Sequence, residues 1–260
     1  MIKLKTPQEI EILREGGLIL GSILENLAHM VAPGVSTETL ENKALKMIKD
    51  ANGTPAFKGY KVRKNDKGFP TALCASINSD IVHGTAIPAK FLKQGDIIGL
   101  DIGMKYKGLF TDTAVTVAVG DIAADWQKLL EVTKQCLELG IKQAKPNNTL
   151  RDIARAIQIN AESNGFGVVR ELVGHGVGYA VHEEPQVPNF DSQEEYLMNI
   201  VLKPGMVIAI EPMLTAGNWR IKTGADGFAL STIDNSMSAH FEHTVAITEE
   251  GNIIITSPED

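Results

Sequence analysis

Apolar and small residues recur with a helical period in four segments of the chain. In the first segment, 7–30, they lie three or four positions apart, at Ile10, Leu13, Gly17, Leu20 and Leu24. This spacing gathers them on one face, so we predict an amphipathic helix that packs on a core. Similar patterns predict helices at about 37–51, 125–144 and 150–163.

The second and fourth of these helices have matching end signals. Thr37 and Thr149 stand where each helical pattern begins, and a threonine hydroxyl can cap the first backbone N–H groups. An Asn-Gly pair follows each pattern, at 52–53 and 164–165, and glycine after asparagine commonly ends a helix. We therefore expect one similar helix pair in each half of the chain.

Two pairs of β-strand patterns repeat in the same way. Residues 92–101 read LKQGDIIGLD and residues 202–211 read LKPGMVIAIE, each an apolar strand that is predicted to end in a carboxylate. Residues 110–120 and 241–251 each place a carboxylate at the start of a Val/Thr-rich strand. Asp101 then corresponds to Glu211, and Asp112 to Glu242.

This repetition predicts one α/β domain over residues 1–260, built from duplicated halves at about 1–121 and 122–260. The alternative is chance similarity between two ordinary α+β segments. Such segments seldom place carboxylates at matching points inside apolar strands. Two halves related by a pseudo-two-fold axis would bring the four acids together between them.

Carboxylates inside apolar strands need a partner, because burying a lone charge is costly. Four converging acids would also repel one another, and no Lys or Arg lies at strand spacing to pair with them. Two divalent cations would balance the four negative charges. Taken alone, an acid such as Asp112 could instead form a turn or a surface ion pair.

Histidines add nitrogen ligands to this oxygen-rich set. His175 and His182 lie in VGHGVGYAVHEEPQ, where glycines at 174, 176 and 178 are predicted to allow close backbone approach to a ligand. His83 precedes the first acidic strand. One of these three can complete a metal shell, and the others can contact a substrate carbonyl or amide.

Two further histidines, His240 and His243, flank Glu242. By strand alternation both should point away from the face that Glu242 uses. We therefore do not predict either of them as a metal ligand.

Composition narrows the class of protein. The net charge of −7 argues against a nucleic-acid binder that works through bulk positive charge, and the basic run at 58–67 is predicted to be a solvated loop. The N-terminal residues do not form a secretory signal, and no apolar run is long enough to span a bilayer. Cys74 and Cys136 form no disulfide framework, so we expect a reduced, soluble, cytoplasmic protein.

Five motifs together resemble type I methionine aminopeptidases over nearly the whole chain. They are HG at 83–84, the Asp pair at 101 and 112, GHGVG-x3-HEEP at 174–185, IEP at 210–212 and SAHFEHT at 238–244. The resemblance implies the pita-bread fold, a mainly antiparallel curved sheet covered by helices with pseudo-two-fold symmetry. It also implies removal of the initiator methionine from nascent polypeptides, by metal-activated water attack on the first peptide bond.

The resemblance implies a role for each motif residue. Asp101 would bind one metal, Asp112 and Glu242 would bridge both, and His175 and Glu211 would bind the other. Glu211 would also act as the general base, His83 would contact the scissile nitrogen, and His182 the carbonyl oxygen. The methionine side chain would lie in a pocket formed by Tyr60, Phe69, Cys74 and Phe228.

The resemblance leaves the metal open between Co, Mn, Fe, Zn and Ni, with two ions per chain. It implies a monomer that acts on nascent N-termini near the ribosome, without direct nucleic-acid or membrane contact. This chain differs from the family pattern in a longer segment at 61–68, Gly103 in place of threonine and Phe228 in place of tryptophan.

Three other functions fit parts of the pattern. They are a pita-bread peptidase specific for proline, a non-catalytic pita-bread binding protein and a metallophosphatase. The SAHFEHT motif favours the methionine enzymes over a proline-specific peptidase, and the filled ligand positions disfavour a non-catalytic binding protein. No glycine-rich phosphate loop supports a metallophosphatase.

Overall fold

The computed structural model describes residues 2–61, 63 and 65–257. Within this part of the chain, four long helices occur: α1 (Pro7–His29), α2 (Thr37–Asp50), α3 (Ala124–Gln143) and α4 (Leu150–Ser163). All four predicted helices are therefore confirmed, with bounds close to those expected. A short helix, α5 (Glu195–Met198), was not predicted. None of the helices among these residues is long and apolar enough to cross a membrane.

The helix caps agree with the sequence at one of the two predicted positions. Thr149 is the N-cap of α4, and its backbone N–H donates to the Asp152 carboxylate at 2.7 Å. The prediction for Thr37 is wrong, because Ser36 caps α2 and accepts from the Thr39 N–H. The Thr37 hydroxyl instead donates to the carbonyl of Ala86, a tertiary partner that sequence spacing does not reveal.

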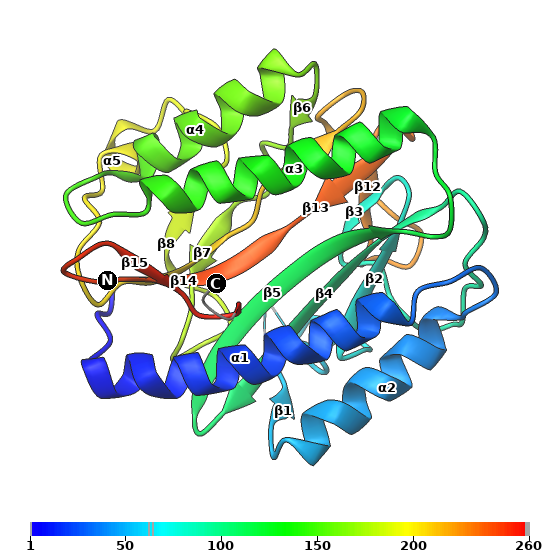
Figure 1. The fold of residues 1–260 in the computed structure, drawn as a ribbon, viewed down its shortest axis with the longest axis horizontal. Coiled ribbons are helices and arrows are strands. Elements are labelled where there is room, and N and C mark those ends of the chain that lie inside the picture. The colour runs from blue at the N-terminus through cyan, green and yellow to red at the C-terminus, as the bar shows by residue number, and fades with distance from the viewer. Residues whose placement is uncertain (1, 62, 64, 258–260) are drawn as a thin grey trace.

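An antiparallel sheet forms the centre of the molecule (Figure 1). Among the described residues its strands follow the order β1 (Thr54–Pro55), β4 (Ile97–Tyr106), β5 (Leu109–Ala118), β14 (Glu242–Ile247), β9 (Val207–Ile210), β7 (Gly174–Gly176) and β8 (Glu183–Val187). Two more strands join it: β2 (Leu73–Ile77) pairs with β4, and β15 (Asn252–Ile254) pairs with β14.

Two smaller antiparallel sheets complete the described structure. One contains β13 (Ser238–His240), β10 (Met213–Thr215) and β6 (Gly167–Val168). The other contains β11 (Ile221–Thr223), β12 (Leu230–Thr232) and β3 (Asp80–Val82). Because β3 ends at Val82, the second of these sheets delivers His83 to the site described below.

The strand order reflects the repeat in the sequence. β5 and β14, the predicted counterparts, lie side by side at the centre, with β4 beyond one and β9 beyond the other. β4 does not end at Asp101 as predicted; it continues to Tyr106 and turns into β5 through Lys107 and Gly108, both at positive φ. Such a two-residue turn suits a twisted hairpin. Asp101 and Asp112 therefore lie inside strands rather than at their ends.

Residue alternation along the strands separates the core from the acids. Leu100 and Ile102 of β4 pack into a cluster with α1 and α2, and Ile208 and Ile210 of β9 pack into a cluster with α3 and α4. The four helices lie against one face of the sheet (Figure 1). Since neighbouring residues in a strand face opposite ways, Asp101 points to the other face.

Candidate active site

Three of the predicted acids occupy adjoining positions on one face of the sheet. Asp101 pairs with Ala114, and Ala114 pairs with Glu242 across the junction of the two halves. Asp112 lies two residues before Ala114, on the same face. The pairing of β5 with β14 therefore brings these acids together, although they are far apart in sequence.

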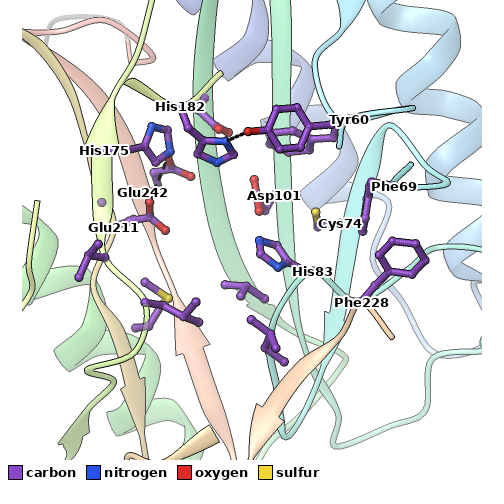
Figure 2. A pocket seen from close by; sticks show the side chains of 18 of the residues that line it. Tyr60, Phe69, Cys74, His83, Asp101, His175, His182, Glu211, Phe228 and Glu242 are labelled. Carbon is purple, nitrogen blue, oxygen red and sulfur yellow. Dashed lines mark hydrogen bonds and ion pairs between the residues drawn. The ribbon is translucent and has the colours of Figure 1, made fainter. Parts of the chain in front are cut away.

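His175 and Glu211 approach the same place from β7 and from the end of β9. His175 pairs with Ala209, which in turn pairs with Thr244, two residues after Glu242. One ligand atom each from Asp112, His175 and Glu242 lie within 4.8 Å of one another, a spacing that could hold a metal ion. Figure 2 shows His83, His175 and His182 around the same space as Asp101, Glu211 and Glu242.

The acids lack the partners that buried charges need. One oxygen each of Asp101, Asp112 and Glu242 is buried without a hydrogen-bond partner among the described residues. Nor does any described Lys or Arg form an ion pair with these acids. Orphaned carboxylate oxygens, beside a histidine nitrogen, are suited to a divalent cation.

The pKa values show the same unbalanced charge. Burial raises the pKa of Asp101 to about 6, and it raises those of Asp112 and Glu242 well above the ordinary carboxyl value, with mutual repulsion adding to the effect. Burial would also raise the pKa of Glu211, but the nearby imidazoles of His240, with Nε2 3.4 Å from Oε2, and of His175 lower it overall. Glu211 is thus the acid that ionises most readily.

A backbone contact fixes the tautomer of His175. Its Nδ1 lies 2.9 Å from the carbonyl oxygen of Gly176, which can only accept, so Nδ1 carries the proton. The Nε2 lone pair is therefore free to bind a cation, as ligating histidines require. Nε2 lies 3.6 Å from Oε1 of Glu211.

The glycines around His175 lie against neighbouring protein segments. A Cβ at Gly174 would overlap the Ala209 carbonyl, one at Gly176 would overlap the Glu184 carbonyl, and one at Gly178 would lie 2.5 Å from Cε of Lys5. These residues therefore allow close approach of neighbouring protein segments, and Gly174 also borders the cavity, so close backbone approach to a ligand stays a prediction.

His83 and His182 border the cavity as neutral imidazoles. Surrounding protein crowds both rings while one side stays open to the cavity, and this desolvation lowers the pKa of His83 and lowers that of His182 to about 4. His83 is held at φ +59, a conformation uncommon outside glycine. The Tyr60 hydroxyl lies 2.7 Å from Nδ1 of His182.

His240 departs from the prediction, whereas His243 follows it. β13 ends at His240 and β14 begins at Glu242, so alternation does not run through Phe241. His240 is buried beside the acids, with Nε2 3.4 Å from Oε2 of Glu211. His243 points away from them, with Nδ1 2.9 Å from the Thr256 hydroxyl.

An aromatic pocket adjoins the acids in one cavity of about 970 Å³ (Figure 2). Phe69 packs edge-on against Phe228 with ring centroids 5.5 Å apart, and Cys74 and Tyr60 lie in the same cluster. Two backbone hydrogen bonds, Gly59 N–H to the Phe69 carbonyl and Phe69 N–H to the Tyr60 carbonyl, close the base of the longer loop. They hold Phe69 beside Tyr60 despite the extra residues between them.

Sequence reasoning missed Phe57, which lines this cavity and belongs to the same cluster. A Cβ on Gly103 would lie 2.9 Å from the Phe57 ring, so glycine at 103 makes room for it. The apolar residue before Lys58 was the available signal.

In the basic run at 58–67, the described cationic side chains are exposed as predicted, while residues 62 and 64 lie outside the described part.

The arrangement is suited to metal-assisted hydrolysis. It combines candidate metal ligands, an ionised carboxylate and neutral histidines, all facing a cavity with an apolar recess. Such a set could activate water, bind a carbonyl and hold one apolar side chain.

Comparison with known proteins agrees with this chemistry. Residues 11–249 match metallopeptidase family M24. Methionine aminopeptidase 1 of Bacillus subtilis is 46% identical over 257 residues, covering 98% of this chain and 99% of that one. Methionine aminopeptidase of Aquifex aeolicus is 44% identical and covers 98% of each chain.

Solved structures confirm the α/β pita-bread fold. The crystal structure of methionine aminopeptidase from Thermotoga maritima superimposes with a TM-score of 0.93 at 41% identity, covering 99% of this chain and 100% of that one. An Xaa-Pro dipeptidase from Bacillus anthracis, at 24% identity and TM-score 0.76, covers 99% and 63% and shows the fold alone. The chain therefore belongs to metallopeptidase family M24 and, within it, to the methionine aminopeptidases.

Proposed function

We propose that this protein removes the N-terminal methionine from newly made polypeptides. The observation that carries the proposal is one cavity that joins a cluster of unpaired buried carboxylates to an aromatic recess. Full-length similarity to enzymes named methionine aminopeptidase supports it. A proline-specific peptidase is supported only by fold similarity.

We infer that Asp101, Asp112, His175, Glu211 and Glu242 hold two divalent cations, of Co, Mn, Fe, Zn or Ni. The unpaired oxygens of Asp101, Asp112 and Glu242 and the free Nε2 of His175 fit this role. Asp112 lies on β5 and Glu242 on β14, the two strands between β4, which carries Asp101, and β9, which Glu211 follows. When bound, such ions would lower the pKa of a water and polarise the substrate carbonyl.

The remaining residues would bind the peptide and move protons. Glu211, the acid that ionises most readily, would accept a proton from the attacking water and deliver it to the leaving amine. If Tyr60 donates its hydroxyl proton to Nδ1 of His182, Nε2 of His182 carries a hydrogen that can stabilise the carbonyl oxygen. His83 would contact the scissile nitrogen.

Tyr60, Phe69, Cys74 and Phe228, together with Phe57, would hold the methionine side chain. A thioether is polarisable and packs favourably against aromatic rings. The substrate's free amine would lie toward the acids, so that only the first peptide bond reaches them.

We further propose that residues 1–260 act as one catalytic domain with halves at about 1–121 and 122–260. The enzyme would act as a cytoplasmic monomer on nascent N-termini near the ribosome. It would not contact nucleic acid or membrane directly, in keeping with its acidic net charge.

The test is release of methionine from Met-Ala-Ser by the purified protein, supplied with Co or Mn, compared with cleavage of an Xaa-Pro peptide. Asp112→Ala should abolish methionine release, while the exposed Asp121→Ala serves as the matched carboxylate control. Native turnover by folded Asp112→Ala, or preference for Xaa-Pro, would overturn the proposal.

A further inference from the structure

The segment before α1 is anchored beside the site through Lys5. The Lys5 N–H donates to the Gly205 carbonyl at 2.7 Å, and Nζ lies 2.8 Å from Oε2 of Glu183. The two side chains are only 1% and 9% exposed. A charge this deeply buried is tolerated only when it is paired, so the ion pair fixes the segment in one position.

Glu183 connects this anchor to the loop that carries His182. Its Oε1 accepts from the Ala180 N–H at 2.8 Å and from the Tyr179 N–H. One oxygen therefore closes the turn at 179–183 and the other binds Lys5. Since Glu183 directly follows His182, the same carboxylate determines where the His182 backbone lies.

Further contacts hold the same turn from the N-terminal side. The Tyr179 hydroxyl donates to the Glu9 carboxylate in the first turn of α1 at 2.9 Å, and Nζ of Lys5 lies 5.0 Å from the centre of the Tyr179 ring. Gly178 has φ +138 and lacks a side chain where Cε of Lys5 passes. The loop is thus shaped around Lys5.

The His182 ring itself depends on this support. It is exposed to the cavity, and its hydrogen bond is to the hydroxyl of Tyr60, a residue that borders the longer loop. The ring stands 4.4 Å from the ring of His175, so a small shift of the turn would change its distance from the ligand cluster.

We propose that Lys5 is a positioning residue, which holds His182 at the substrate carbonyl through Glu183. The inference rests on the proposed function, because it assigns His182 the carbonyl contact. Without Lys5, one Glu183 oxygen is buried and unpaired, and the turn must open to hydrate it.

Lys5→Met tests this, because it keeps the buried stem and removes the charge. The matched control is Lys43→Met, an exposed lysine of α2. With Met-Ala-Ser, Lys5→Met should lower kcat at least about tenfold with KM nearly unchanged, Lys5→Arg should recover most of the loss, and Lys43→Met should change kcat less than about twofold.

The same substitution in a His182→Ala background separates positioning from general stability. If Lys5 acts through His182, Lys5→Met should then lower kcat less than about twofold further. An equal loss in both backgrounds, or no loss in either, would overturn the proposal. If Lys5→Met does not fold, the double variant Lys5→Met/Glu183→Gln removes the unpaired charge of Glu183. Its kcat should stay below that of the native protein. A native kcat in this folded double variant would also overturn the proposal.

Amide hydrogen exchange gives a readout independent of turnover. Lys5→Met should accelerate exchange of the Tyr179 and Ala180 amides, while the strands β4 and β5 stay protected. Unchanged exchange at these two amides would overturn the proposal. If the native protein released no methionine, the proposed function would fail, yet the exchange experiment would still decide whether Lys5 holds the turn.

Discussion

The carboxylate of Glu211 lies between two imidazoles, with Oε2 3.4 Å from Nε2 of His240 and Oε1 3.6 Å from Nε2 of His175. This explains why the pKa of Glu211 is lowered despite its burial, whereas those of Asp112 and Glu242 are raised. Groups in one cluster with opposite pKa shifts are expected to take different roles.

His240→Leu should lower kcat for Met-Ala-Ser about tenfold. Nε2 of His240 lies 3.4 Å from Oε2 of Glu211 and stabilises the ionised carboxylate, and a loss of about 1.4 kcal/mol corresponds to a tenfold change in rate. His240→Gln should retain most activity because an amide N–H can still face the Glu211 carboxylate. The control is His29→Leu, an exposed histidine of α1. Native kcat in His240→Leu would show that Glu211 does not need this contact.

Divalent cations should raise the thermal stability of the protein. A ligand that binds only the folded state stabilises it by about 2.7 kcal/mol at one hundred times its Kd. Differential scanning calorimetry with and without Mn or Co should show a higher Tm with metal, reversed by a chelator. Asp112→Ala should lose most of this increase and Asp121→Ala should keep it. Equal shifts in both variants would place the bound ion elsewhere.

The metal-free protein should lose stability as the pH rises. The pKa of Asp101 is raised from 3.8 to about 6, and burial also raises the pKa values of Asp112 and Glu242 well above their ordinary values. The folded state therefore binds more protons than the unfolded state above about pH 4, and its stability falls as these groups ionise. Above about pH 6.5 the lowered pKa values of His83 and His182 have little further effect on stability, so chelated protein should show a lower Tm at pH 9 than at pH 7.

Asp112→Asn provides the comparison for this pH dependence. The amide is similar in shape but cannot ionise, so Tm should fall less between pH 7 and pH 9 in the chelated variant. Parallel Tm curves for the native protein and Asp112→Asn would contradict the role of Asp112 in this dependence.

Phe228→Ala should weaken binding of the methionine side chain. The Phe228 ring packs edge-on against Phe69 and is only partly buried. Loss of one aromatic contact is worth about 0.5–1.5 kcal/mol beyond the lost area, so kcat/KM for Met-Ala-Ser should fall at least about tenfold. The Tm of Phe228→Ala should change little. The control is Phe91→Ala, an exposed phenylalanine outside this cavity, which should change neither kcat/KM nor Tm appreciably. Unchanged kcat/KM would exclude Phe228 from the pocket.

The sequence by itself determined the helices, the strand pairs that carry the acids and the correspondence between the halves. These features depend on local spacing. A helix such as α4 needs only its apolar face and its cap, and both can be read along the chain. Asp101 and Glu211 could be singled out for a similar reason, since a carboxylate in an apolar run requires compensation wherever the run folds.

Only the tertiary structure decided which atoms meet. The irregular residue Phe241 turned His240 toward Glu211, and alternation could not predict this break in the strand. Packing between distant segments likewise gives the Thr37 hydroxyl a tertiary partner, so that Ser36 rather than Thr37 caps α2. The glycines at 174–178 make room for neighbouring backbone and for Lys5. Contacts of this kind join residues far apart in the chain, so their energies depend on the fold and leave no periodic signal in the sequence.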